Sequence, residues 1–167
     1  MRAVLTCTLL LAELMLFRVA TAQNSAAENE AAICTFEDGK QLTARYNPIA
    51  AGRDGMVVGK VLVPGGSAMT FFTETDLVLG STTIPTGAYT LYIIPAKKDW
   101  TLIVSKNVTV DAKYDDKLDL AKATMELGQL PSPADKLSLY FGHTGPRKCE
   151  INVDFGRTRG WVEFRQK

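Results

Sequence analysis

The sequence predicts a mainly β protein, folded as a single antiparallel β-sandwich or flattened barrel of about eight to nine strands. Short runs of β-branched and aromatic residues alternate apolar with polar side chains, which is the two-residue period of a strand. Clusters of Gly, Pro, Asn and Asp separate these runs at close intervals and predict chain reversals. One segment, residues 111–127, is also compatible with helical spacing.

Residues 76–105 form the centre of the predicted sheet. They contain three β-rich runs, and the middle run is apolar on both faces, as expected of a central strand. Turn clusters at Pro85–Gly87 and Pro95–Asp99 combine a proline of fixed φ with residues that tolerate turning. The stretch therefore predicts an antiparallel meander. Its strands are 77–79, 88–94 and 100–104.

The segment before this meander predicts a hairpin and a further strand. Residues 33–36 and 42–46 flank the Asp38-Gly39 pair, which is favoured in tight hairpins. Residues 56–63 are rich in β-branched side chains and predict a strand that ends at Pro64. Residues 68–75 then lead into the meander.

The segment after the meander is ambiguous at first. Leu118, Ala121 and Met125 have helical spacing, and intrinsic propensity favours a helix there. Residues 121–127 also alternate like a strand, and in a β-rich chain a strand from about Leu120 is at least as credible. Beyond it we expect a break at the two prolines of 131–133 and a hairpin loop at 156–160. The final strands are predicted at 137–141, 149–155 and 161–165.

The N-terminus resembles a targeting segment. A basic residue at Arg2 precedes a mostly apolar run, and small residues precede a cleavage point between Ala22 and Gln23. We therefore expect a signal peptide at 1–22, a flexible leader at 23–32 and one domain at 33–167, with a secreted or periplasmic location. The apolar run is too short for a membrane anchor, so we expect no membrane span in the mature chain.

The charge of the chain argues against two classes of partner. Removing residues 1–22 takes two of the 19 basic residues and one of the 18 acidic ones, which leaves a formally neutral mature chain. Proteins that bind nucleic acids or anionic membranes need a concentrated excess of Lys and Arg. We therefore expect no nucleic-acid partner.

Two cysteines remain after cleavage, Cys34 and Cys149. In an oxidising compartment such a pair is compatible with a disulfide, which would close a long loop. Two separate buried thiols are the alternative. The sequence leaves both open, because it does not show whether the two sulfur atoms are close.

Catalytic and metal chemistry have weak signals. His143 is the only histidine, and no Gly-x-Ser-x-Gly elbow is present to supply a nucleophile beside it. The densest group of carboxylates is compatible with a calcium site, but it lacks the glycine and terminal glutamate of an EF-hand loop, and a solvated loop is the simpler interpretation. We expect no cofactor. The calcium candidates are Asp111, Asp115, Asp116 and Asp119.

Two further groups are candidate ligand-binding residues. Arg157 and Arg159 are spaced to clamp an anion, although charged residues also protect sheet edges from pairing. Several aromatic residues would stack on sugars if they shared an exposed face, although aromatic side chains on strands more often lie in the core. These aromatic residues are Tyr89, Tyr92, Trp100, Tyr140 and Trp161.

Residues 84–92 and 94–103 read IPTGAYTLY and IPAKKDWTLI, a pattern that resembles a bacterial family of secreted proteins known as domain of unknown function 2911. The likeness extends to the strands expected around Arg45 and around residues 119–141. It implies an exported, mainly β domain with a strand after Asp119, and it implies no reaction. Where many relatives carry a Trp-Arg-x-Gly-Ala-Asn segment, this chain has Pro64–Thr70, so a site built on that segment is not expected here.

These observations lead to three hypotheses about function. The first is an exported, non-catalytic β-sandwich that binds a protein or a glycan, or serves a structural role, in the cell envelope or the secreted fraction. The second is a hydrolase-like enzyme with a site near His143. The third is a module stabilised by calcium.

Overall fold

The computed structural model describes residues 29–52, 56–109 and 113–167. The predicted signal peptide, its cleavage point at Ala22 and Gln23, and Asp111 lie outside these residues. Two 3-10 turns, η1 (Pro64–Gly66) and η2 (Asp116–Leu118), accompany the strands. The strands are β1 (Glu30–Thr35), β2 (Gln41–Tyr46), β3 (Met69–Thr73), β4 (Leu77–Leu79), β5 (Thr82–Ile84), β6 (Gly87–Pro95), β7 (Trp100–Ser105), β8 (Asp119–Gly145) and β9 (Lys148–Gln166).

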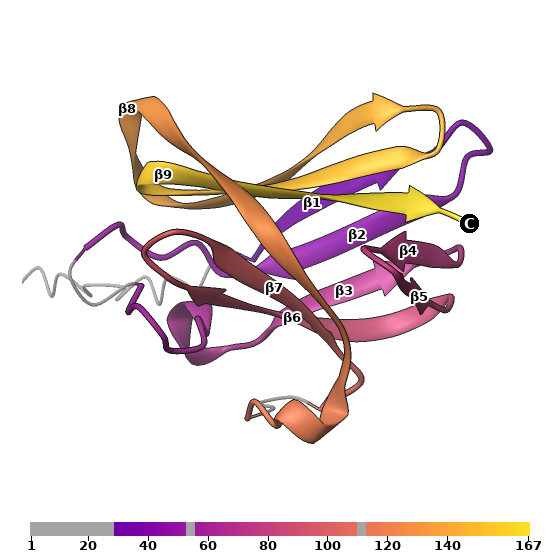
Figure 1. Cartoon of the computed structure of the whole chain (residues 1–167), viewed down its shortest axis with the longest axis horizontal. Coiled ribbons are helices and arrows are strands. Elements are labelled where there is room, and N and C mark those ends of the chain that lie inside the picture. The colour runs from indigo at the N-terminus through magenta and orange to yellow at the C-terminus, as the bar shows by residue number, and fades with distance from the viewer. Residues whose placement is uncertain (1–28, 53–55, 110–112) are drawn as a thin grey trace, which may run out of the picture.

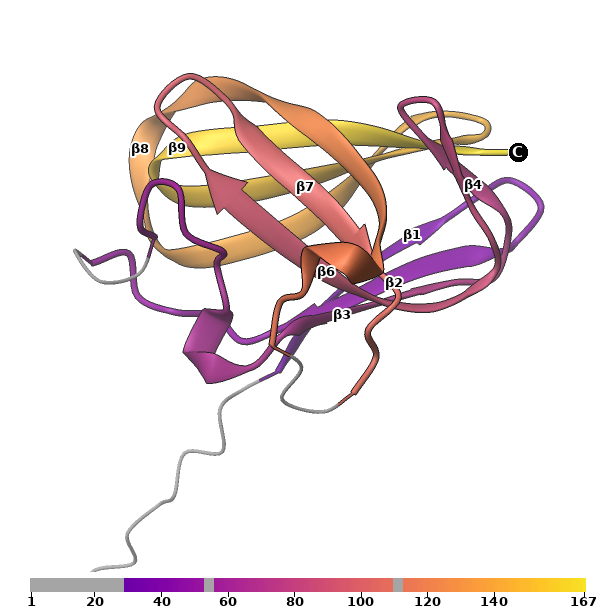
Figure 2. The same cartoon turned by 60° about the horizontal axis from the view of Figure 1, so that its bottom comes forward.

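The nine strands form one antiparallel sheet in the order β1-β2-β3-β6-β7-β8-β9-β4-β5, which is not closed into a barrel. The predicted fold class, mainly β with about eight to nine antiparallel strands, is confirmed. The long β8–β9 ribbon bends sharply, so that it lies over the strands β1 and β2 (Figures 1 and 2). The sheet therefore has two halves, β1–β3 with β6 and β7, and the β8–β9 ribbon with β4 and β5.

Contacts between the two halves enclose the core. The rings of Phe71 on β3 and Phe164 on β9 stack with centroids 5.2 Å apart. The backbone N–H of Leu139 on β8 donates to the hydroxyl of Tyr46 on β2 over 3.0 Å. Buried aliphatic side chains from both halves fill the space between these contacts, and their removal from water supplies the main driving force for folding.

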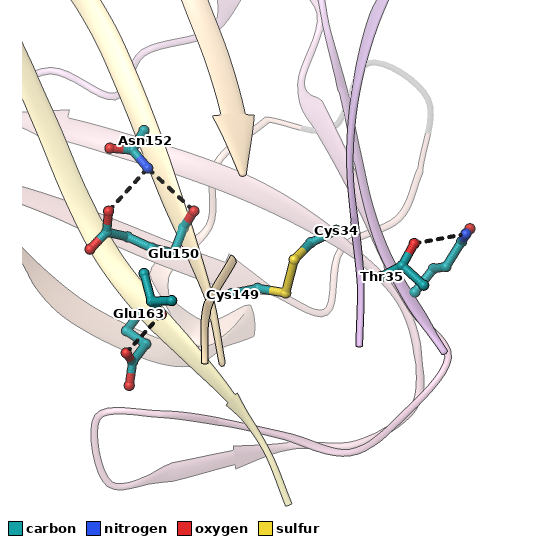
Figure 3. Close-up of a disulfide and its surroundings, with 8 residues drawn as sticks. Cys34, Thr35, Cys149, Glu150, Asn152 and Glu163 are labelled. Atoms are coloured by element: carbon teal, nitrogen blue, oxygen red, sulfur yellow. Dashed lines mark hydrogen bonds between the residues drawn. A yellow bond between two sulfur atoms is a disulfide. The ribbon is translucent and has the colours of Figure 1, made fainter. Parts of the chain in front are cut away.

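A disulfide joins Cys34 on β1 to Cys149 on β9 (Figure 3). Both residues lie in the core, at 5% and 0% exposure, and 115 positions separate them in the sequence. The sequence left the state of this pair open, and the structure has the bridge. The disulfide therefore links one edge of the sheet to the ribbon that covers it.

The first hairpin and the two central strands are found where the sequence predicts them. In the hairpin, Cys34 lies opposite Leu42. Strands β6 and β7 pair with each other, with Leu91 opposite Val104. β1 begins at Glu30 and so includes the last residues of the segment expected to be a leader.

Two expectations around the central strands are wrong. Residues 56–63 form no strand, and their only pairing is an isolated bridge between Leu62 and Ile93, because Val57 and Val58 are exposed instead of packed. The run 77–79 does not form a meander with β6. It pairs with β5, which the sequence did not predict, and with β9 from the end of the chain.

The ambiguous segment is a strand. β8 starts at Asp119 and pairs with β7, which buries Ala121 and Met125 on the core side. The helical alternative is therefore wrong, because a neighbouring strand supplies partners that outweigh intrinsic propensity. The prolines at 131–133 do not end the strand, but the pairing with β9 shifts register between Gln129 and Ala134.

The hairpin loop expected at 156–160 is also wrong as a loop. These residues belong to β9. Residues 158–160 pair with residues 127–129 of β8, and Gly156 pairs with Ala134. The chain nevertheless turns back here, since Gly156 has a φ of 56° and the two ends of β9 meet. The backbone N–H of Gln166 donates to the carbonyl of Arg147 over 2.8 Å.

In the described part of the chain, no helix has the length and apolar character that crossing a membrane requires.

Candidate functional site

The outer face of β9 carries polar side chains from both ends of this strand. Before the bend, Cys149, Ile151 and Val153 point into the core, so the residues between them face outward. After the bend, Phe164 is fully buried, and Trp161 and Glu163 fall on the opposite side. The alternation of the strand thus places polar groups from both halves of β9 on one surface.

Polar contacts hold the two halves of β9 next to each other. Arg159 donates to both carboxylate oxygens of Asp154, over 2.7 and 2.8 Å. Glu163 accepts from the ammonium group of Lys148 at 3.1 Å and from the hydroxyl of Thr144 at 3.1 Å. These contacts make one continuous polar surface out of two segments of one strand.

A groove of about 590 Å³ opens on this surface. We call it the ribbon groove. Glu150 and Glu163, which line it, lie on neighbouring segments beside the disulfide (Figure 3). The side-chain amide of Asn152 donates to Glu150 over 3.2 Å and fixes the position of that carboxylate. The residues that line the groove are Val78, Gly80, Thr124, Glu126, Lys148, Glu150, Trp161, Val162, Glu163 and Arg165.

Trp161 is the one aromatic residue that lines the ribbon groove. Its ring packs against β8 at Gly128, where an added Cβ would lie 3.0 Å from a ring carbon. Any side chain at that position would displace the ring. Gly128 therefore allows Trp161 to lie against the backbone of β8 while the residue remains partly exposed to the groove.

Tyr140 and Arg159 form a separate cluster near the bend. The guanidinium of Arg159 lies 5.4 Å from the ring centroid of Tyr140, a cation–π distance. The hydrogen bonds that Arg159 donates to Asp154 raise the pKa of Arg159, and burial, followed by the charge of Asp154, raises the pKa of Tyr140. Arg159 is thus already neutralised by Asp154.

The anion clamp and the broad aromatic surface expected from the sequence are not assembled. Arg157 is exposed and has no ion pair among the described residues, while Arg159 is held by Asp154. Tyr92 and Trp100 are buried, at 0% and 5% exposure, and the ring of Tyr92 packs edge-on against Tyr114. Two predicted ligand-binding aromatics are therefore part of the packed interior.

Two of the four aspartates considered as calcium candidates have other partners. Asp115 caps η2 by accepting from the backbone of Lys117 over 3.0 Å. Asp119 binds the ammonium group of Lys122 at 2.7 Å and the hydroxyl of Tyr114 at 2.8 Å. Within the described ranges, no three His, Cys, Asp or Glu side chains group as metal ligands. Asp116 is exposed on η2.

His143 lies near the end of β8, opposite Cys149 in the strand register. Its side chain is exposed and makes no hydrogen bond to a carboxylate or a hydroxyl among the residues described. A catalytic histidine needs such partners to orient its ring and to activate a nucleophile. No contact of His143 among the described residues therefore supports the hydrolase hypothesis.

A comparison with family models matches residues 27–164 to a family described as a protein of unknown function (DUF2911). A search of curated proteins found no match, and neither did a search of solved structures. The match includes the whole of β1–β8 and all but the end of β9. The resemblance seen in the sequence is confirmed, and the chain belongs to the DUF2911 family of proteins of unknown function.

Proposed function

We propose that this chain is the non-catalytic binding module of an exported protein, and that it binds a neutral glycan in the ribbon groove. Export is supported by the signal-like N-terminus and by the Cys34–Cys149 disulfide, since disulfides persist mainly in oxidising compartments. The observation that carries the glycan assignment is the placement of Trp161 against Gly128, among side chains that form hydrogen bonds.

The two parts of the groove match the two parts of a sugar ring. A sugar has an apolar C–H face and a rim of hydroxyl groups that both donate and accept hydrogen bonds. The indole of Trp161 offers a flat apolar surface to the first. The carboxylates of Glu126 and Glu150 accept hydrogen bonds, and the cations of Lys148 and Arg165 donate them.

The charge of the groove favours an uncharged ligand. Three glutamates face one lysine and one arginine, and Lys148 is already paired with Glu163. An anionic ligand would meet more carboxylates than cations in this groove. A ligand that interacts through hydroxyl groups has no such repulsion, and the hydrogen bonds it forms with charged groups are the stronger kind.

The test is the binding of a panel of neutral oligosaccharides to the purified protein, measured by array and by titration calorimetry. Trp161→Ala should weaken binding by about tenfold or more, because the stacking surface is lost. Gly128→Ala should also weaken it, because the new Cβ displaces the ring without removing it. Lys98→Ala, in the exposed turn between β6 and β7, is the control and should bind normally.

Thermal unfolding of each variant separates lost binding from lost structure. Binding that is equal in the native protein, Trp161→Ala and Gly128→Ala would contradict the assignment to this groove. A panel in which no neutral oligosaccharide binds the native protein would contradict the glycan function itself.

A further inference from the structure

A second concave region lies on the opposite half of the sheet, on the outer face of β2, β3 and β6. We call it the apolar hollow, and its volume is about 480 Å³. β3 and β6 lie along the underside of the molecule, away from the β8–β9 ribbon (Figures 1 and 2). The residues that line the apolar hollow and those that line the ribbon groove have no member in common. The two regions are therefore independent.

Strand register builds the surface of the hollow. Thr43, Phe72 and Ala88 lie opposite one another on the three strands. Their neighbours Leu42 and Phe71 point into the core at 0% and 1% exposure, so this row must point outward. The arrangement is fixed by hydrogen-bonded strands and needs no rearrangement to form.

The hollow combines exposed apolar side chains with several hydroxyl-bearing ones. Phe72 is 46% exposed and Val108 is 57% exposed, and both line it. The hydroxyls of two other lining residues already have partners, because Tyr89 donates to the carbonyl of Pro85 and Thr90 donates to the carbonyl of Asn107. Exposed apolar side chains gathered in a concave region are typical of a small-molecule site.

Among the described residues, Arg45 is the only charged one that lines the hollow. It lies opposite Thr70 in the next row of the sheet and is exposed. Among the residues that the structure describes, its side chain makes no ion pair and no hydrogen bond. In the described part of the chain, this guanidinium therefore has no counter-ion, in contrast to Arg159.

We propose that the apolar hollow binds an amphipathic carboxylate, a small molecule with one carboxylate and an acyl chain. The fork of N–H donors on Arg45 matches a carboxylate in geometry and in charge. The exposed rings and methyl groups of Phe72, Ala88 and Val108 cover the chain. The volume lies within the usual range for small-molecule sites. One cation suits one negative charge, whereas an anionic membrane surface would need a cluster of cations.

The test is titration calorimetry of the purified protein with decanoate, and with decanol as an uncharged ligand of the same chain length. Arg45→Gln should weaken decanoate binding by about tenfold or more and leave decanol binding unchanged. Phe72→Ser should weaken the binding of both ligands, because it removes part of the apolar surface. Arg157→Gln is the matched control, since Arg157 is also exposed and unpaired among the described residues, and it should bind like the native protein.

Three results would overturn the proposal. The native protein could fail to bind decanoate, Arg45→Gln could bind it as tightly as the native protein does, or binding could be seen only with vesicles that contain anionic lipid. Because the hollow and the ribbon groove are separate, Arg45→Gln should keep its glycan binding. If decanoate binding fails, the proposed glycan function is unaffected. If glycan binding fails, the proposed carboxylate site is likewise unaffected.

Discussion

The two halves of the folded sheet differ in the chemistry of their outer faces. On the β8–β9 ribbon, charged side chains are numerous and several are paired with each other, as Arg159 is with Asp154 and Lys148 with Glu163. On β2, β3 and β6, the outer face carries exposed apolar side chains and threonines, and Arg45, the one cation of the hollow among the described residues, has no partner there. Paired charges favour neutral ligands, and an unpaired cation favours an anion. One sheet therefore supports two separate kinds of recognition.

The halves also differ in how they are stabilised. Backbone hydrogen bonds pair the strands within each half, and the β7–β8 ladder continues this pairing from one half to the other. Where the ribbon lies over β1–β3, side chains supply most of the core between the halves. The disulfide, the Phe71–Phe164 stack and the Tyr46 hydroxyl are three of the contacts that join the halves there. Substitutions at these points test whether the two faces depend on a common core.

The largest expected effect is the loss of the disulfide. Replacing Cys34 and Cys149 together by alanine should lower the free energy of unfolding by about 2–5 kcal/mol, because the cross-link restricts the unfolded chain. Urea unfolding measures this, and the native protein with reductant should approach the variant. A double variant that unfolds at the same urea concentration as the oxidised native protein would show that the bridge does not stabilise the contact between the halves.

A smaller effect is expected from Tyr46→Phe. The change removes the hydroxyl that accepts from the backbone N–H of Leu139 and leaves that buried group without its partner. The cost of an unsatisfied buried donor is about 1–3 kcal/mol. Urea unfolding should show a loss of this size, while Tyr140→Phe, whose hydroxyl makes no recorded bond to the described residues, should show little loss. Equal losses in the two variants would contradict the role of Tyr46.

The smallest effect concerns pH. Hydrogen bonds from Lys136 and from Tyr46 lower the pKa of Glu30 below its ordinary value of 4.5. A carboxylate whose pKa is lowered by folding stabilises the protein above the pKa of the unfolded state, and that contribution is lost as the pH falls through the pKa of the folded state. Glu30→Gln lacks this contribution.

The native protein should therefore be more stable than Glu30→Gln at neutral pH, and the difference should shrink as the pH falls below about 4.5. Thermal unfolding over a pH series measures this difference. A difference that stays constant, or grows in acid, would contradict the assigned direction of the pKa shift.

Local patterns predicted the strands whose partners are close in sequence. The Asp38-Gly39 pair and the alternation around it fixed the first hairpin, and the apolar run of β6 marked a central strand. The same reasoning failed at residues 56–63, which meet β6 only at an isolated bridge and leave Val57 and Val58 exposed. It also failed at 156–160, where pairing with β8 keeps the bent segment within a strand.

The candidate sites were less accessible to prediction than the fold. Alternation separates the two faces of a strand, but it does not show which face is covered, so buried Tyr92 and Trp100 looked as available as Trp161. The placement of Trp161 depends on the missing side chain of Gly128, a residue on another strand. The unpaired state of Arg45 likewise depends on strands β3 and β6, which follow it in the sequence.

The most direct measurement is a crosswise binding experiment with two ligands and two variants. A neutral oligosaccharide and decanoate are each titrated into Trp161→Ala and Arg45→Gln. We expect Trp161→Ala to lose the oligosaccharide and keep decanoate, and Arg45→Gln to do the opposite. A variant that loses both ligands while remaining folded, or two variants that lose neither, would contradict the claim that the two faces of the sheet recognise different chemistry.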